Sequence, residues 1–157
     1  MPLTLDRRML AGLALLGSAA VLLGAFAFQY LGGMQPCTLC IWQRWPHGAA
    51  ILIGVVALFV PSRMLMVLGA VAVLTSAAIA GFHVGVEQGW WQGLATCSAG
   101  SITGLSVDDL LNPDVAVAAP VRCDAIAWSM WGISMAGWNG IVSVFLAAVW
   151  IAAARAD

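Results

Sequence analysis

Four apolar runs limit this chain to a helical membrane protein. The run from Met9 to Phe28 has 20 residues, the run from Met64 to Phe82 has 19, and neither contains a charge. At a rise of 1.5 Å per residue, a helix needs about 20 apolar residues to cross a bilayer. The composition agrees, because 62% of the residues are hydrophobic and 8% are charged, whereas soluble domains have about 25% charged residues. The net charge of −1 gives no basic patch, which argues against a nucleic-acid partner.

The apolar run from Gly48 to Val60 is too short to cross a bilayer by itself, with 13 residues. Completing this span draws Cys40, Arg44 and His47 into the outer edge of the membrane as its first two turns. We therefore expect an all-α membrane protein, a four-transmembrane-helix bundle in one domain over residues 1–157. The expected spans are about 9–29, 40–60, 64–83 and 138–154, with a long loop over about 85–137.

The first apolar run has a rival interpretation as a secretory signal peptide. Arg7 and Arg8 precede it, and the sequence Ala25-Phe26-Ala27 resembles a cleavage site. However, the apolar region of a signal peptide has about 7–15 residues, so we favour a retained helix. With either interpretation, Cys37 follows on the far side of the membrane.

The distribution of arginines predicts the orientation of the spans. Four spans place both termini on one side of the membrane, and most of the basic residues fall on that side. These are Arg7, Arg8, Arg63 and Arg155, with Arg44 and Arg122 opposite. Because cytoplasmic loops carry an excess of Lys and Arg, both termini are predicted to be cytoplasmic. All four cysteines then lie on the non-cytoplasmic side, where disulfides persist.

The segment from Gly85 to about Gly137 is the one sizeable stretch outside the predicted spans. Its scattered Gly, Ser and Pro are typical of a mobile loop rather than a folded domain. Its acidic residues are Asp108, Asp109, Asp114 and Asp124, together with Glu87 near its start. Within it, Trp128, Trp131 and Met135 recur at helical spacing. We expect these three side chains to form the lipid face of a short helix lying in the membrane interface.

Cys37 and Cys40 form a Cys-x-x-Cys pair at the predicted start of the second helix. At positions i and i+3 their sulfurs lie on one helix face within bridging distance. The exposed N–H groups and the positive end of the helix dipole stabilise a thiolate there, which favours a redox pair. A static disulfide and half of a metal site are the alternatives, although a structural zinc site needs four closely set ligands.

Ionisable side chains near this pair are candidates for function, because a charge inside a membrane is costly. Arg44 follows Cys40 by four residues, which puts its guanidinium over the same helix face. There it either stabilises a thiolate at Cys40, binds a carbonyl oxygen of a lipid-soluble oxidant, or extends to the lipid headgroups. His83 either donates to that carbonyl, moves a proton, or is an interfacial side chain. For His47 we favour the interfacial alternative.

Cys97 and Cys123 remain as a long-range pair. Four cysteines allow three connectivities, and the spacing favours Cys37–Cys40 as the local pair. As a structural staple, the long-range disulfide would contribute about 3–4 kcal/mol. However, the loop shows no core to brace, so we favour exchange with a thiol of another protein.

The sequence Cys37-Thr-Leu-Cys40-Ile-Trp-Gln-Arg44-Trp-Pro46, the second cysteine pair and the four spans resemble the DsbB family of bacterial disulfide bond formation membrane proteins. The resemblance covers nearly the whole chain. It implies a multi-pass protein of the bacterial inner membrane with its cysteines on the periplasmic side. A reduced DsbA-like thioredoxin-fold protein would attack the loop disulfide, and Cys97 would carry the mixed disulfide. Electrons would then pass through the Cys37–Cys40 pair to a quinone, either ubiquinone or menaquinone.

By the same resemblance, Cys40 would meet the quinone ring as a thiolate, and Arg44, His83 and Met135 would line the quinone site. The sequence therefore favours a quinone-dependent protein-dithiol oxidase. An enzyme serving one dedicated substrate, or one similar to vitamin K epoxide reductase, is a related alternative. A different class of alternative is a non-catalytic membrane protein whose cysteines form structural disulfides or bind a metal.

Overall fold

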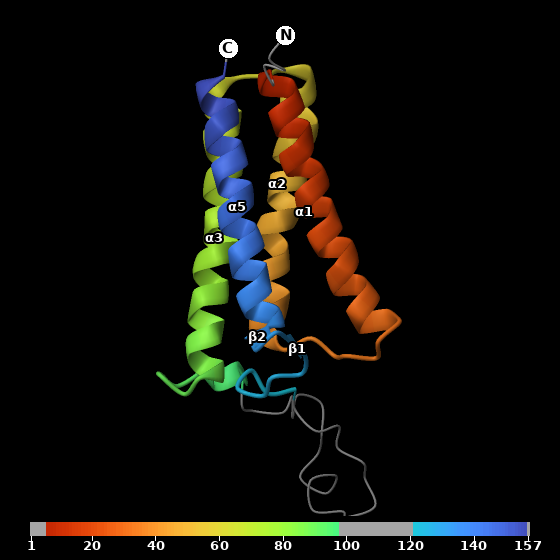
Figure 1. The fold of residues 1–157 in the computed structure, drawn as a ribbon, viewed down its shortest axis with the longest axis vertical. Coiled ribbons are helices and arrows are strands. Elements are labelled where there is room, and N and C mark those ends of the chain that lie inside the picture. The colour runs from red at the N-terminus through yellow and green to blue at the C-terminus, as the bar shows by residue number, and fades with distance from the viewer. Residues whose placement is uncertain (1–5, 98–120, 157) are drawn as a thin grey trace, which may run out of the picture.

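Four long helices run side by side in the computed structural model of the protein, which describes residues 6–97 and 121–156. Both ends of the chain lie at the same end of these helices (Figure 1). The helices are α1 (Arg7–Tyr30), α2 (Thr38–Phe59), α3 (Arg63–Glu87) and α5 (Met135–Arg155); the short elements are η1 (Ala95–Cys97), β1 (Ser129–Met130) and β2 (Ile133–Ser134). Each expected span overlaps one of the four long helices.

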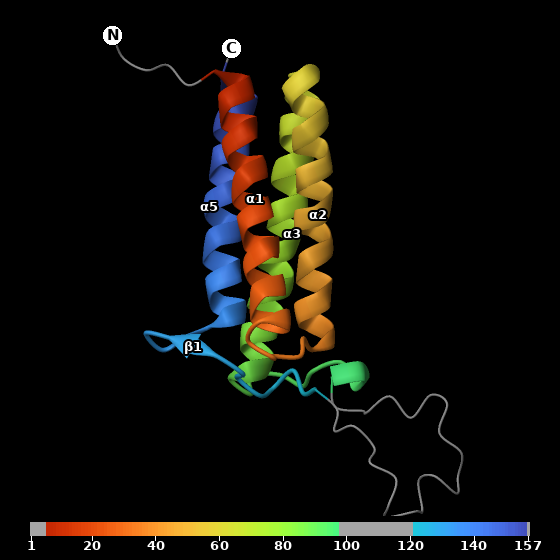
Figure 2. The same ribbon diagram turned by 90° about the vertical axis from the view of Figure 1, so that its right-hand side faces the viewer.

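The four helices pack as a closed ring. α1 packs against α2 and α5, and α3 packs against the same two helices; Figure 2 shows α1 beside α5 and α3 beside α2. Small side chains let the helix backbones approach closely. A Cβ atom added at Gly69 of α3 would lie 2.6 Å from the ring of Trp150 on α5. The buried core that holds these contacts is Ala11, Ala14, Ala50, Ala57, Met66, Ala70, Val73, Leu146, Ala147, Trp150 and Ala153.

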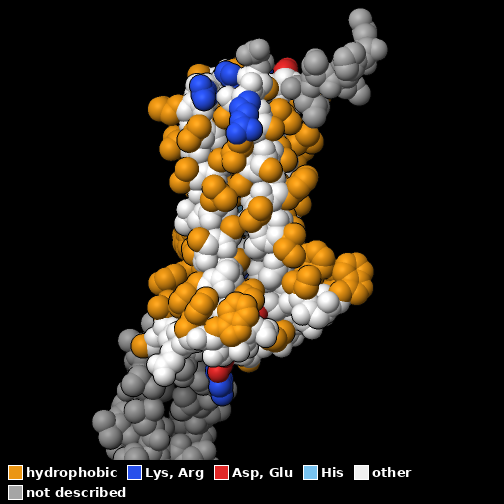
Figure 3. Space-filling model, turned by 60° about the vertical axis from the view of Figure 1, so that its left-hand side comes forward, with side chains coloured by type: hydrophobic (Ala, Val, Ile, Leu, Met, Phe, Trp, Pro, Cys, Tyr) orange, Lys and Arg blue, Asp and Glu red, His pale blue; other side chains and the backbone are white. Residues whose placement is uncertain are grey.

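Three of the helices, α1, α3 and α5, are long and apolar enough to cross a membrane. α2 is long enough, with 22 residues, but its first half contains Gln43, Arg44 and His47 and it does not reach the same hydropathy. Figure 3 shows apolar side chains along the flank of the helices and basic side chains gathered at the end that holds the termini. The apolar side chains that are more than half exposed include Leu23, Leu52, Phe59, Val71 and Phe145. An apolar outer surface of this kind suits a lipid environment.

Arg7 ties several segments together at the end that holds the termini. Its guanidinium donates hydrogen bonds to the carbonyl oxygens of Pro61 at 3.2 Å, Ala153 at 3.3 Å and Ala156. These carbonyls belong to the α2–α3 connection and to the end of α5, so one side chain satisfies groups that the helix ends leave without backbone partners.

The segment before α5 is a β-hairpin, so the expected interfacial helix through Trp128, Trp131 and Met135 is wrong. β1 pairs antiparallel with β2, and the turn residues Trp131 and Gly132 have φ values of 53° and 78°. Two successive positive φ values are typical of the type I′ turn of a two-residue hairpin and are incompatible with an α-helix. Met135 is instead the first residue of α5, and Ser134 caps this helix by accepting a hydrogen bond from Gly137 N at 3.2 Å.

The expected loop over about 85–137 is structured at both ends. α3 continues to Glu87, and the chain from residue 121 to the hairpin lies across the helix ends far from the termini (Figures 1 and 2). On this surface Arg122 pairs with Asp124, and the guanidinium lowers the pKa of the Asp124 carboxyl. Asp108, Asp109 and Asp114 lie outside the described residues, as does the rest of 98–120, so the expected mobility of the loop stays a prediction there.

Candidate functional site

Cys37 is the N-cap of α2, which places its sulfur at the positive end of the helix. Its backbone is extended, with φ −74° and ψ 171°, and Cys37 Sγ accepts a hydrogen bond from Cys40 N at 3.3 Å. Cys40, one turn later, brings its Sγ to 2.9 Å from Cys37 Sγ, and both cysteines are free thiols. Hydrogen bonding with the Cys40 thiol lowers the pKa of Cys37, and the neighbouring His83 adds to this effect against the opposing effect of burial. Cys37 is therefore the sulfur best prepared to exist as a thiolate, and the thiolate that the resemblance implies at Cys40 stays a prediction.

His83 connects this thiol pair to the loop. The side chain is 3% exposed, and its Nε2 lies 3.6 Å from Cys37 Sγ and 3.1 Å from the carbonyl oxygen of Cys123. The carboxylate of Glu87, one turn later on α3, lies 3.9 Å from the same nitrogen. The interfacial alternative for His83 is therefore excluded, because the imidazole is enclosed between the thiol pair and the loop.

Cys97 and Cys123 form a disulfide, as the spacing predicts. The expectation that the loop has no core to brace is wrong at this bond, because Cys97 is 4% exposed and Cys123 is fully buried. Both pack in a small apolar cluster with Cys37, Leu39 and Val86. The ends of the loop therefore do have a small core, in which the disulfide packs against the start of α2 and the end of α3.

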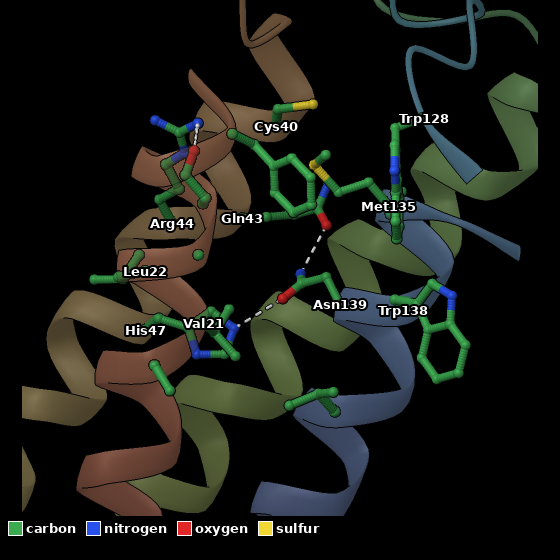
Figure 4. Close-up of a pocket in the computed structure, with 16 residues that line it drawn as sticks. Val21, Leu22, Cys40, Gln43, Arg44, His47, Trp128, Met135, Trp138 and Asn139 are labelled. Atoms are coloured by element: carbon green, nitrogen blue, oxygen red, sulfur yellow. Dashed lines mark hydrogen bonds between the residues drawn. The ribbon is translucent and has the colours of Figure 1, made fainter. Parts of the chain in front are cut away.

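A cavity of about 250 Å³ lies beside Cys40, among α1, α2 and α5 (Figure 4). Its lining residues are Ala20, Val21, Leu22, Gly24, Ala25, Phe28, Cys40, Gln43, Arg44, His47, Trp128, Met135, Ala136, Trp138, Asn139 and Val142. Most of these side chains are apolar, and a few polar groups on α2 and α5 interrupt them. A mostly apolar pocket with a few convergent polar groups is the common form of a site for an organic ligand.

The structure brings three of the seven predicted site residues to this cavity. Arg44 and Met135 line it together with Cys40, whereas His83 does not. His83 lines an adjacent cavity of about 140 Å³, whose wall also includes Cys37, Cys40, Arg44 and Met135. The thiol pair thus lies between the two cavities. Cys40 lines both of them, and Cys37 lines the smaller one.

Arg44 is held against α1 rather than extended to the headgroups. Its Nη1 donates to Gln29 Oε1 at 2.6 Å, and its Nη2 donates to the carbonyl oxygen of Ala25 at 3.4 Å. The guanidinium carbon also lies 5.1 Å from the centre of the Phe26 ring, within cation–π range. These contacts fix a positive charge in the wall of the cavity.

A chain of buried polar side chains, most of them not predicted as site residues from the sequence, runs from His83 into the helix interior. Gln43 Nε2 lies 3.0 Å from His83 Nδ1 and donates to the carbonyl oxygen of Leu39 at 3.2 Å. Asn139 Nδ2, on α5, donates to Gln43 Oε1 at 2.7 Å and to Ser76 Oγ at 3.1 Å. Gln43 and Asn139 therefore connect α2, α3 and α5 at the inner wall of the larger cavity (Figure 4).

His47 ends this chain, and its expected interfacial position is wrong. The side chain is 1% exposed, and its Nε2 lies 3.0 Å from Asn139 Oδ1 and 3.2 Å from Ser143 Oγ. A signal for these residues was present in the sequence. Gln43 and His47 are four residues apart, as are Asn139 and Ser143, so each pair lies on one face of an otherwise apolar helix. Polar side chains inside a membrane helix face partners in other helices.

Replacing Gln43 with leucine is expected to destabilise the protein by about 2 kcal/mol. The substitution removes three side-chain hydrogen bonds, each worth about 0.6 kcal/mol between membrane helices. Thermal unfolding in detergent measures the loss. Gln35→Leu, at an exposed position before α2, is the control and should unfold as the wild type does. Equal stability of Gln43→Leu and the wild type would show that the buried chain contributes nothing to the packing.

Comparison with known proteins assigns the chain to a family. Residues 7–153 match the family described as "Disulfide bond formation protein DsbB". The chain belongs to the DsbB family. A protein named disulfide bond formation protein B from Paracidovorax citrulli is 31% identical over 150 residues, which cover 87% of this chain and 82% of that protein. The protein of the same name from Acinetobacter baumannii is 27% identical, covering 86% and 83%.

An uncharacterized protein of Rickettsia prowazekii, RP370, is also similar, with 27% identity over 90% of this chain and 84% of its own length. No solved structure matches the chain. Membership of the DsbB family, together with three helices able to cross a membrane, makes this chain a membrane protein of disulfide bond formation. Its two cysteine pairs are the groups that such chemistry requires.

Proposed function

We propose that the chain reoxidises a periplasmic, DsbA-like thioredoxin-fold protein and passes the electrons to a membrane quinone. The observation that carries this proposal is the position of the Cys37–Cys40 thiol pair beside an apolar cavity whose wall includes Arg44. The names of the related proteins point to disulfide bond formation. The proposed catalytic residues are Cys37, Cys40, Cys97 and Cys123.

The larger cavity suits the flat, apolar head group of a quinone. Cys40, Arg44 and Met135 would hold it there, while His83 acts from the adjacent cavity. A bound quinone, whether ubiquinone or menaquinone, supplies an acceptor for two electrons and two protons. Oxidation of the Cys37–Cys40 dithiol to a disulfide releases two electrons and two protons, so the overall reaction balances.

The two sulfurs have different surroundings, which we take to give them different roles. The helix N-terminus and His83 stabilise a thiolate at Cys37, while Cys40 faces the larger cavity. Gln29 and Phe26 hold the guanidinium of Arg44 in the cavity wall, where a positive charge favours a developing oxyanion. His83 lies close enough to Cys37 to accept its proton.

The loop disulfide is the proposed entry point for electrons. A thiolate of the reduced partner attacks Cys97 and forms a mixed disulfide, which releases Cys123 as a thiolate; the second partner thiolate then attacks the mixed disulfide and leaves oxidised. Exchange between the reduced loop pair and a Cys37–Cys40 disulfide passes the two electrons inward. Because the Cys97–Cys123 bond is buried, it must become exposed before a thiolate of the partner can attack it. Both loop cysteines share one apolar cluster with Cys37, which supports a direct exchange between the two pairs.

The proposed membrane topology follows from the four long helices and the positions of the arginines. α2 is taken as the fourth span in a four-transmembrane-helix bundle of the bacterial inner membrane. The termini and the arginines around them face the cytoplasm, and the cysteines face the periplasm. The buried polar chain explains how the less apolar half of α2 is accommodated, because Gln43 and His47 find partners on α3 and α5.

The test of the proposal is turnover by the purified chain in detergent or nanodiscs. With added quinone and a reduced thioredoxin-fold dithiol, each oxidised partner should be matched by one reduced quinone, followed by quinone absorbance and free-thiol titration. Depleting the quinone should stop the reaction after the protein's own disulfides are consumed. Thiols that react with neither the thioredoxin-fold protein nor the quinone would favour the non-catalytic alternative, in which the buried Cys97–Cys123 bond is a structural staple.

A further inference from the structure

Three metal-ligand atoms converge at the reduced thiol pair. Cys37 Sγ, Cys40 Sγ and a ring nitrogen of His83 all lie within 4.8 Å of one another. We propose that this trio, in its reduced state, binds one Zn²⁺ ion or a similarly soft divalent cation, and that the bound ion holds the pair reduced. Thiolate sulfur and imidazole nitrogen are the ligands that zinc prefers. Binding needs reduced thiols but does not depend on the electron acceptor.

The spacing of the ligand atoms is close to what zinc requires. Tetrahedral coordination with Zn–S of about 2.3 Å and Zn–N of about 2.05 Å implies an S···N separation of about 3.6 Å and an S···S separation of about 3.8 Å. Cys37 Sγ and His83 Nε2 are already 3.6 Å apart. The two sulfurs, at 2.9 Å, must separate by roughly 1 Å. Cys40 has room for this movement because it faces both cavities.

The charges around the trio permit a cation. Two thiolates neutralise a divalent ion, and the carboxylate of Glu87 lies 3.9 Å from His83 Nε2. Two arginines, Arg44 and Arg122, line the smaller cavity that leads to the site. Arg122 is paired with Asp124, and the guanidinium of Arg44 is turned to acceptors on α1. The three protein ligands leave the fourth position to water or to Glu87.

Gln43 supplies the outer support that a ligating histidine needs. Metal-bound imidazoles donate their other ring N–H to a fixed acceptor. Gln43 lies 3.0 Å from His83 Nδ1, and turning its carboxamide would present the oxygen to that N–H in exchange for the present contacts with Asn139 and Leu39. Binding at Nε2 also replaces the contact between this nitrogen and the carbonyl oxygen of Cys123. The ion would therefore compete with the present contact between His83 and the loop.

Cation binding and disulfide formation exclude each other at this pair. Binding converts two thiols into two zinc-bound thiolates and releases two protons, with no change in oxidation state. Formation of the Cys37–Cys40 disulfide removes both thiolates, so the oxidised pair offers His83 alone. The site is thus specific for the reduced state, and zinc is expected to slow turnover until a chelator removes it.

The experiment measures zinc bound to the purified full-length chain by competition with a chromophoric chelator and by elemental analysis. Reduced protein should retain one zinc per chain, and protein with an oxidised Cys37–Cys40 pair should retain none. His83→Gln should weaken binding to the reduced protein by at least about tenfold, the lower end of the loss from substitutions in outer-shell groups. His47→Gln changes the chain's other histidine and should leave zinc affinity unchanged.

A further variant separates the two cysteine pairs. With Cys97 and Cys123 both replaced by serine, the reduced chain should still bind one zinc, whereas Cys40→Ser should not. Equal zinc retention by the oxidised and reduced forms, or an unchanged affinity in His83→Gln, would overturn the proposal. Turnover with quinone in the presence of a chelator tests the proposed function separately. Turnover without zinc binding would refute only the cation site, and zinc binding without turnover would refute only the proposed function.

Discussion

Cys97→Ser is expected to abolish oxidation of a reduced thioredoxin-fold protein while leaving oxidation of a small dithiol such as dithiothreitol largely intact. The substitution removes the Cys97–Cys123 disulfide, which is the proposed point of attack for a protein partner. The Cys37–Cys40 pair and the cavity beside it remain. Cys37 and Cys40 both line the adjacent smaller cavity, so we expect a small dithiol to reach the pair there and a folded partner not to. Quinone absorbance, followed with each reductant in turn, measures the two rates.

Activity with the small dithiol is the internal control for folding of the Cys97→Ser variant. Cys40→Ser is the matched comparison and should abolish turnover with both reductants, because it removes the sulfur that faces the cavity. Ala49→Ser, on the exposed face of the same helix, should retain both rates. Normal turnover of a protein partner by Cys97→Ser would show that electrons enter the Cys37–Cys40 pair directly.

The long helices were predictable from the sequence because length and apolar composition alone determine them. Met9–Phe28 and Met64–Phe82 need no knowledge of their neighbours to be identified as membrane helices. The same reasoning failed for the segment before α5. There Trp128, Trp131 and Met135 have helical spacing, but Trp131 and Gly132 adopt positive φ values in a hairpin turn. Spacing carries no information on such a turn, which depends on the backbone of two residues.

The thiol pair of the site was predictable for a local reason, and most of its surroundings were not. Cys37 and Cys40 are close because they share one helical turn. The burial of His47 depends on Asn139 and Ser143, which are more than 90 residues away in the chain. The burial of the Cys97–Cys123 disulfide likewise depends on Val86 and Leu39. The burial of His47 and of the disulfide is thus decided by contacts between distant segments, and these contacts cannot be read from a single sequence.

Arg44→Met is expected to raise the KM for quinone by about 10–150-fold with a smaller change in kcat. A hydrogen bond from a charged group contributes about 1.5–3 kcal/mol, and each 1.4 kcal/mol is about tenfold in affinity. Methionine fills a similar volume in the cavity wall but offers no donor. Because the guanidinium is held by Gln29 and stacked on Phe26, its position is fixed before the ligand binds. Little binding energy is then spent on ordering the side chain.

Steady-state kinetics over a range of quinone concentrations measure this effect, and Arg63→Met is the control. Arg63 is the first residue of α3, at the end of the bundle that holds the termini, and its replacement should leave the KM unchanged. Arg44→Lys should fall between methionine and the wild type, because lysine keeps the charge but lacks the planar fork that Gln29 and the Ala25 carbonyl hold. An unchanged KM in Arg44→Met would mean that the acceptor does not contact this guanidinium. The positive charge would then serve the packing of α1 against α2, and the loss should appear as a lower unfolding temperature instead.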